Sequence, residues 1–149
     1  MTYSRPPTSP ANILIRERNG TEHAFLTDFG VSKHRQGDPQ LTGTGLAIGT
    51  ADYIAPEQAQ GRNTDGRADI YSLACVLFQA LTGQIPFEGD SDLDKLWAHV
   101  HEPPPALNEL RPDLPPALAA ALTTALSTQP AERQQTAGAF ARAARAALA

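Results

Sequence analysis

The sequence predicts a mainly α-helical domain that carries one short β-hairpin. Two short β-prone runs, residues 13–15 and 24–26, are joined through a turn that contains Asn19-Gly20, which is typical of a hairpin. From about residue 67 to residue 148 the apolar residues instead recur at helical spacing, in stretches separated by glycine and proline. At 149 residues the chain has the length of one domain with one core.

The first helical stretch begins near Arg67 and is expected to form the centre of the core. Its apolar residues fall at i, i+3, i+4, i+7, i+8 and i+11 and form a broad face: Ile70, Leu73, Ala74, Leu77, Phe78 and Leu81. Gly83 and Pro86 are helix-ending residues, so the helix should stop before them. Because most of its surface is apolar, we expect its neighbours to cover it.

Three further helices are predicted. The first starts at Ser91 as its N-cap and stops at the prolines 103–105. Its expected packing face consists of Leu93, Leu96, Trp97 and Val100. The second runs from about Pro115 to Leu126, with proline suited to its first turn. The third begins near Thr136 on an alanine-rich background. The residues of this last helix at core spacing are Phe140, Ala143, Ala144 and Ala147.

Bulk composition excludes several classes of function. With 12 Lys+Arg against 16 Asp+Glu, the net charge of −4 offers no basic surplus for nucleic acid or anionic lipid. No apolar run approaches the roughly 18 residues of a membrane span, and residues 1–15 hold no apolar signal segment. The single cysteine, Cys75, has apolar neighbours and should be buried. The four histidines show no metal-ligand spacing. We expect a cytoplasmic protein.

A polar, glycine-dotted stretch, residues 31–48, separates the hairpin from the helices. Asp28-Phe29-Gly30 precedes it, and Ala55-Pro56-Glu57 follows it. Long loops without internal structure are usually functional or disordered. The two tripeptides at this interval are the bracket of a protein kinase activation segment.

Further motifs of a protein kinase occur along the chain in the order that the family has them. They are Pro10-Ala11-Asn12-Ile13-Leu14, Gly49-Thr50, Ala55-Pro56-Glu57-Gln58, Asp69-Ile70-Tyr71-Ser72-Leu73, Leu81-Thr82-Gly83, Pro86-Phe87 and Arg133. With them the chain resembles the C-terminal lobe of a bacterial, eukaryotic-like Ser/Thr protein kinase. The resemblance implies a large kinase lobe with a short hairpin, lacking the N-terminal β lobe of the complete α+β fold. We divide the chain into an unrelated or disrupted leader, 1–9, and a partial kinase domain, 10–149. The latter holds the end of the catalytic loop, the activation segment 28–57 and a helical bundle 67–148.

The resemblance assigns roles in phosphoryl transfer. Asp28 and Asn12 would hold Mg²⁺ with its ATP, and both are the hard oxygen donors that Mg²⁺ prefers. Thr50 would help to position the acceptor hydroxyl. Thr42 and Thr44 would be phosphorylated, which adds up to about two negative charges each. That both are ordinary loop threonines is an equally open interpretation.

Three charged residues have structural roles by the same resemblance. Glu57 would pair with Arg133 and seat the activation segment on the helical lobe. Asp69 would accept hydrogen bonds from backbone N–H groups of the catalytic loop and tie that loop to the core.

The catalytic loop departs from the family pattern. The family's H-R-D-x-K-P-x-N would occupy residues 5–12, and there Pro7 stands in place of the catalytic Asp. Ser9 stands in place of the phosphate-contacting Lys, and Pro6 in place of the Arg that captures a phosphothreonine. The glycine-rich loop, the strand lysine and its glutamate partner would lie before Met1. Half of the nucleotide site would thus be absent. Because the chain lacks the catalytic base and the phosphate clamp, we expect no kinase activity from it alone.

Three explanations remain open. The chain is a truncated or disrupted kinase gene product, which would act on a protein substrate if completed. Alternatively, it is a lobe-only, pseudokinase-like binding module that docks a partner kinase or another protein. A third explanation is an all-helical interaction domain whose motifs arose by chance, which makes Asp69 and Glu57 surface charges.

Overall fold

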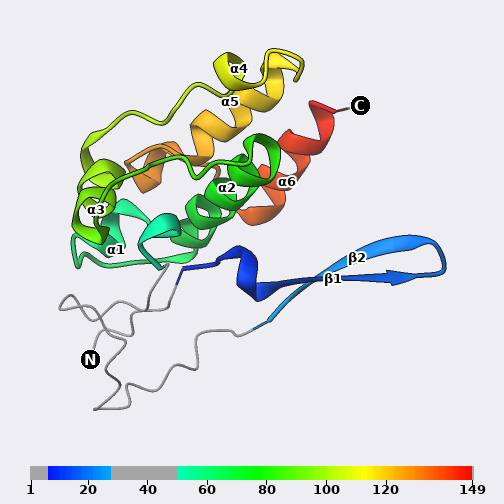
Figure 1. The fold of residues 1–149 in the computed structure, drawn as a ribbon, viewed down its shortest axis with the longest axis horizontal. Helices are drawn as coiled ribbons and strands as arrows, with labels where there is room; N and C mark the ends of the chain where they lie inside the picture. The colour runs from blue at the N-terminus through cyan, green and yellow to red at the C-terminus, as the bar shows by residue number, and fades with distance from the viewer. Residues whose placement is uncertain (1–6, 28–49, 149) are drawn as a thin grey trace.

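The computed structural model describes residues 7–27 and 50–148, which form a β-hairpin and a bundle of helices (Figure 1). The hairpin pairs β1 (Ile13–Arg18) with β2 (Thr21–Leu26) in antiparallel fashion, and Ile13 lies opposite Leu26. Its two turn residues both have positive φ, 54° at Asn19 and 73° at Gly20, as a two-residue turn of the I′ type requires. The predicted hairpin is confirmed. A 3₁₀ turn, η1 (Pro10–Asn12), leads into it.

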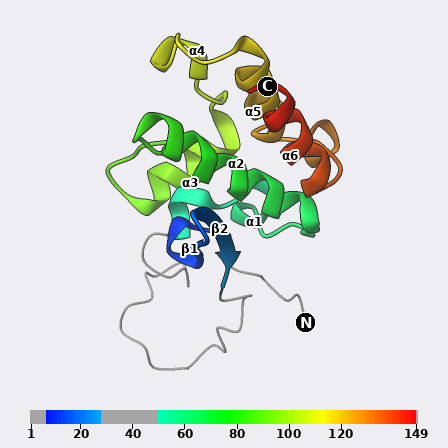
Figure 2. The same cartoon turned by 90° about the vertical axis from the view of Figure 1, so that its right-hand side faces the viewer.

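The hairpin extends away from the helices, on the side opposite α4 in both views (Figures 1 and 2). Its apolar side chains are 45 to 59% exposed, and they lie on both faces of the two strands: Leu14, Ile15, Phe25 and Leu26. A two-stranded hairpin is only marginally stable by itself in water. The hairpin therefore presents apolar surface that the rest of the described chain leaves largely uncovered.

The helical bundle contains the four predicted helices and several short elements. In chain order it comprises η2 (Thr50–Tyr53), α1 (Pro56–Ala59), α2 (Gly66–Thr82), α3 (Asp92–His101), α4 (Leu107–Leu110), α5 (Pro116–Ala125), η3 (Pro130–Glu132) and α6 (Ala137–Ala146). The predicted helices are α2, α3, α5 and α6. The short helices α1 and α4 were not predicted, because a single turn is too short to show a period. Within the described ranges, none of the helices has the length and apolarity needed to cross a membrane.

Helix α2 forms the centre of the bundle, as predicted. Asp65 caps its start by accepting a hydrogen bond from the Arg67 N–H at 2.9 Å. Its buried face packs against η2, α4, α5 and α6. The large or apolar residues of this face are Ile70, Tyr71, Ala74, Cys75 and Phe78. The expected burial of Cys75 is thus confirmed.

The packing face predicted for α3 is wrong at Leu93 and Trp97, whereas Leu96 and Val100 are half-buried. Leu93 is 64% exposed and Trp97 is 57% exposed, whereas Ala98 and His99 are buried. The helix lies at the edge of the bundle and packs against α1 and η2. A small side chain and a flat one fill this contact. Trp97 instead stacks on His101, with 4.7 Å between ring centroids. The Ser91 cap itself is confirmed, since its hydroxyl accepts from the Asp94 N–H at 3.2 Å.

The glycine that ends α2 allows a test of whether its positive φ requires glycine. Gly83 follows the helix with φ 79°, and its N–H donates to the Gln79 carbonyl at 2.8 Å. We expect Gly83→Ala to lower the free energy of unfolding by roughly 1 kcal/mol, because an L-residue is strained in this conformation. Gly66→Ala is the matched control: both sites have open space for a Cβ, but Gly66 is helical, so alanine should be neutral or stabilising there. Urea unfolding measures both, and equal effects would contradict this explanation.

Candidate functional site

The base of the hairpin places Asn12 beside the residue that precedes Asp28. The Thr27 N–H donates to the Asn12 carbonyl at 2.8 Å, and the Thr27 hydroxyl lies 3.3 Å from the same oxygen. Asn12 itself is half-buried at the end of η1. Asp28, Thr42 and Thr44 lie outside the described residues. Hairpin pairing thus brings together the two chain segments that carry the expected metal ligands.

These segments suit a hard cation. Asn12 offers an amide oxygen, and the residue after Thr27 is an aspartate, so both donors are of the type that Mg²⁺ takes. Over residues 7–27 and 50–148, no group of three or more His, Cys, Asp or Glu side chains is placed to hold a metal ion. The expected pair of Asn12 and Asp28 stays a prediction, and it would need phosphate oxygens or water to complete its shell.

The catalytic-loop positions lie just before η1. Pro7 is buried, and Ser9 is half-buried with an extended backbone, φ −128° and ψ 161°. The Ser9 carbonyl accepts the Asn12 N–H at 3.0 Å, which closes the 3₁₀ turn. A proline ring has no atom that takes up a proton, so position 7 supplies no general base. Pro6 lies outside the described residues.

The turn η2, which begins at Thr50, is fastened to α2 at its far end. The Ser72 hydroxyl lies 2.7 Å from the Tyr53 carbonyl, and the Tyr53 hydroxyl donates to Gln79 Oε1 at 2.7 Å. Burial, followed by the charge of Asp52, raises the pKa of Tyr53 and keeps its hydroxyl protonated as a donor. The backbone on which Thr50 sits is thereby held against the central helix. Sequence reasoning did not identify Ser72 or Gln79 as its supports.

Glu57 and Arg133 meet in the interior of the bundle. Their side chains are joined by two parallel hydrogen bonds, Nη1 to Oε1 and Nη2 to Oε2, each 2.8 Å long. Glu57 is 5% exposed and Arg133 is 2% exposed. This geometry is the bidentate fork that makes arginine suited to buried carboxylates. Because Glu57 is buried, the interpretation that makes it a surface charge is wrong.

The remaining N–H groups of Arg133 are also paired. Nε donates to the Ser127 carbonyl at 2.7 Å, Nη1 to the Arg67 carbonyl at 3.0 Å and Nη2 to the Thr128 carbonyl at 3.2 Å. With the two bonds to Glu57, all five donors of the guanidinium are used. The guanidinium also lies 4.8 Å from the centroid of the Tyr71 ring. One side chain thus joins α1, the start of α2 and the loop after α5.

Asp69 lies in the first turn of α2 and is half-buried. The segment expected to donate hydrogen bonds to it includes residues 1–6, which lie outside the described chain. Its role in tying down the catalytic loop therefore stays a prediction.

His99 is a buried histidine that sequence reasoning treated as unremarkable. Its Nδ1 lies 2.8 Å from the Tyr71 hydroxyl, and its ring packs 4.7 Å from that of Phe87. Burial lowers the pKa of His99 to about 4, against the opposing effect of the Ala51 and Asp52 backbone. His101, two residues on, is exposed, so the two rings lie on different sides of α3. The only sequence signal for the burial of His99 is the neighbouring Ala98, a small residue suited to close packing.

Comparison with known proteins gives a consistent match. The family profile described as "Protein kinase domain" matches residues 9–141. Serine/threonine-protein kinase PknJ of Mycobacterium tuberculosis is 43% identical over 142 residues, and PknD of the same species is 44% identical over 140. Each alignment covers 93% of this chain, but only 24% of PknJ and 20% of PknD. PknA of M. tuberculosis is 42% identical over 132 residues, covering 89% of this chain and 29% of that protein. The chain thus spans less than a third of the length of these relatives.

The buried ion pair predicts a large loss of stability when one partner is neutralised. Glu57→Gln should lower the free energy of unfolding by about 3 to 5 kcal/mol, because Arg133 keeps a buried charge without its carboxylate. Asp113→Asn is the matched control, since Asp113 and Arg111 form an exposed pair at 2.7 Å, a kind that contributes little. Urea unfolding followed by circular dichroism measures both. A loss at Glu57→Gln no larger than that at Asp113→Asn would contradict the structure.

His99 predicts a specific dependence of stability on pH. Its folded pKa of about 4 lies below the ordinary 6.5, so the unfolded chain binds this proton more readily. The contribution of His99 to the free energy of unfolding is therefore complete above pH 6.5 and is lost as the pH drops from 6.5 toward 4. The loss is roughly 2 to 3 kcal/mol between pH 7 and pH 4.5.

Urea unfolding of the wild type and of His99→Gln at several pH values isolates this contribution. Asp65 and Asp113 have lowered pKa values through hydrogen bonds from Arg67 and Arg111, so they lose their contribution only in more acidic solution. The variant should have a flatter profile between pH 6.5 and 4.5. An unchanged slope in His99→Gln would show that another group is responsible.

Proposed function

The chain belongs to the protein kinase domain family, and from this premise we propose that it is the helical, C-terminal part of a Ser/Thr protein kinase domain. The reaction of a complete domain is transfer of the γ-phosphoryl group of ATP to a Ser or Thr hydroxyl of a protein. The observation that carries the proposal is the hydrogen bond between Asn12 and Thr27, which joins Asn12 to the residue that precedes Asp28 in the sequence. The family match over residues 9–141 supports it independently.

Phosphoryl transfer requires positioning and charge neutralisation more than covalent chemistry. Asn12 and Asp28 would hold Mg²⁺, which neutralises the phosphate oxygens of ATP when it is bound. The hydrogen bond from the Thr27 N–H to the Asn12 carbonyl holds Asn12 beside the residue that precedes Asp28 in the sequence. The base of the hairpin is therefore the element that would set the spacing of this pair.

The acceptor side rests on η2. Thr50 would help to position the acceptor hydroxyl, and the turn that it begins is bonded to α2 through Ser72 and Gln79. The Glu57–Arg133 pair anchors the next element, α1, in the bundle. Thr42 and Thr44 would be the regulatory phosphorylation sites in the segment between Asp28 and Thr50.

We propose that this chain alone does not catalyse the reaction. Pro7 occupies the position of the catalytic base and Ser9 that of the phosphate-contacting lysine, so neither proton transfer nor the phosphate clamp is supplied from these positions. ATP and Mg²⁺ would be bound productively only in a complete domain.

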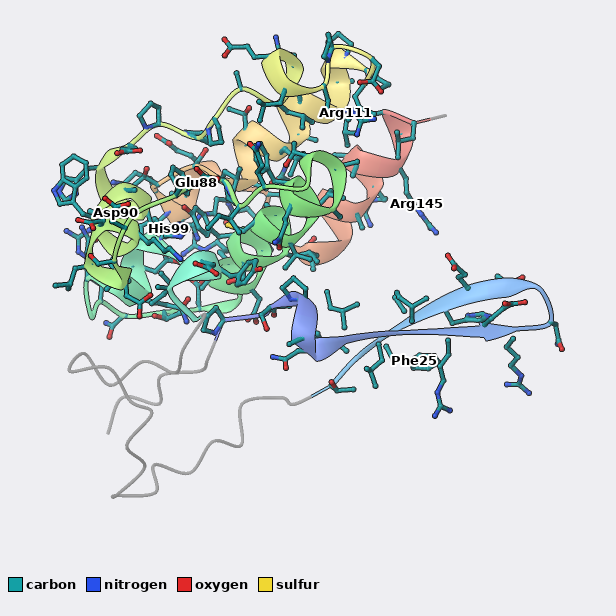
Figure 3. The ribbon with its side chains drawn as sticks, viewed as in Figure 1. Phe25, Glu88, Asp90, His99, Arg111 and Arg145 are labelled. Carbon is teal, nitrogen blue, oxygen red and sulfur yellow. The ribbon has the colours of Figure 1, made fainter. Side chains whose placement is uncertain are left out.

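A binding module that docks a partner protein is a second candidate function. The exposed apolar side chains on both faces of the hairpin favour it, because soluble proteins rarely leave such a patch without a partner. In Figure 3, Phe25 lies on the hairpin, apart from the side chains of the bundle. Under this alternative, Phe25→Ser would abolish binding to a purified partner kinase without lowering the melting temperature of the helices.

Radiolabelled phosphate transfer from ATP to a generic protein substrate tests the proposal. The chain alone should give no transfer above the blank. A chimera that joins residues 10–149 to the N-terminal part and catalytic loop of PknJ should be active, and Asp28→Ala should reduce its rate at least about 100-fold, because a metal ligand is lost. Asp113→Ala in the same chimera is the control and should leave the rate unchanged. Transfer by the chain alone that Asp28→Ala abolishes, or a folded chimera without activity, would overturn the proposal.

A further inference from the structure

His99 occupies the interior between three elements of the bundle. It lies in the second half of α3, is 1% exposed and faces α2 through Tyr71, whose ring centroid is 5.6 Å away. Figure 3 shows it among the packed side chains on the α3 side of the bundle. Helix α3 also packs against η2, the turn that begins with Thr50. A polar ring at this junction must find partners for both of its nitrogens.

The partner of Nδ1 determines the state of the ring. Burial raises the pKa of Tyr71 well above 10, so its hydroxyl stays protonated and can donate to Nδ1 across the 2.8 Å contact. A neutral imidazole that accepts at Nδ1 carries its proton on Nε2. Nε2 is fully buried and has no hydrogen-bond partner among the residues that the structure describes. A buried N–H without an acceptor lowers the free energy of unfolding by about 1 to 3 kcal/mol.

The backbone of η2, against which α3 packs, is the candidate acceptor for Nε2. The peptide groups of Ala51 and Asp52 favour the protonated ring, which is the effect of carbonyl oxygens close to an imidazole N–H. The charged groups that face the ring are Asp52 from η2 and Lys95 from α3, and Tyr71 faces it from α2. Lys95 and Asp52 form an ion pair of 2.5 Å. Because Lys95 lies one helical turn before His99, the two side chains share one face of α3.

We propose that His99 is a positioning residue for the acceptor-binding turn: protonated on Nε2, it bridges the Tyr71 hydroxyl and the Ala51–Asp52 carbonyls and so fixes η2 against α2 and α3. Thr50 precedes Ala51 directly, so any movement of this backbone moves Thr50 as well. The inference rests on the proposed function for the role of Thr50, but the bridge itself is a property of the chain as it stands.

Two measurements on the complete 149-residue chain test the bridge. The first is the ¹⁵N spectrum of the wild-type His99 ring, which should show the Nε2–H tautomer with Nδ1 as an acceptor. The second is amide hydrogen exchange in His99→Phe, which keeps an aromatic ring against Phe87 but removes both nitrogens. Exchange at Ala51, Asp52 and Tyr53 should rise at least about tenfold, while the amides at the centre of α2 keep their wild-type rates.

Two further variants, His99→Gln and His101→Gln, serve as controls for the hydrogen-exchange measurement. Glutamine at position 99 retains a donor and an acceptor and should restore part of the protection of η2, even if phenylalanine impairs folding. His101 lies on the same helix but is exposed, so His101→Gln should leave exchange unchanged. An Nδ1–H tautomer in the wild type would overturn the inference. So would an equal rise of exchange in η2 and the centre of α2, because that pattern indicates a general loss of stability.

The active chimera separates this inference from the proposed function. There, His99→Phe should raise the KM for a peptide substrate severalfold more than it lowers kcat, since the turn that seats the acceptor is loosened. An inactive chimera contradicts the proposed function and leaves the exchange result standing. An active chimera with unchanged exchange at residues 51–53 in His99→Phe contradicts the bridge alone.

Discussion

The interaction on which the bundle depends is the buried pair between Glu57 and Arg133. It joins residues that are far apart in sequence and satisfies all five N–H groups of the guanidinium with Glu57 and three backbone carbonyls. A buried pair of this kind adds little net stability compared with apolar residues of the same size, since both charges lose their water. Its effect is on specificity: a different arrangement of α1, α2 and the loop after α5 would leave a charge stranded.

The main contacts of the bundle and the expected catalytic positions involve different residues. Packing of the bundle requires α2, the Glu57–Arg133 pair and the supports of η2, and none of these involves position 7. Under the proposed assignment, Pro7 in place of an acid would remove the general base without removing any partner of the Glu57–Arg133 pair or of η2. The acceptor-side elements, η2 and α1, are held by residues of the bundle itself. The expected metal pair would depend on the hairpin, whose apolar faces are largely uncovered. Within this chain, the acceptor side of the proposed site is thus packed on the bundle, whereas the metal side depends on a hairpin with few packing contacts.

The sequence predicted the elements whose signals are local. Asn19-Gly20 identified the hairpin, and Ser91, Thr136 and Gly83 marked helix ends, because caps and turns depend on the chemistry of a few adjacent residues. The face of α3 could not be predicted in this way. Its larger apolar residues, Leu93 and Trp97, are exposed, since the helix meets its neighbours through Ala98 and His99. Periodicity finds an apolar stripe, but it does not tell which side of an edge helix another element covers. The His99 bridge depends on contacts between three elements and has no sequence signature. The roles of Asp28, Thr42 and Thr44 stay predictions from the family resemblance.

A double-mutant cycle between Glu57 and Arg133 tests the central claim most directly. Unfolding free energies would be measured for Glu57→Met, Arg133→Met and the double variant, with methionine filling the volume of each long side chain. If the pair organises the bundle, the double variant should be less destabilised than the sum of the single variants by about 2 to 3 kcal/mol, because neither charge is then left stranded. Additive effects, within about 0.5 kcal/mol, would contradict the account, since they would mean that the two residues act independently.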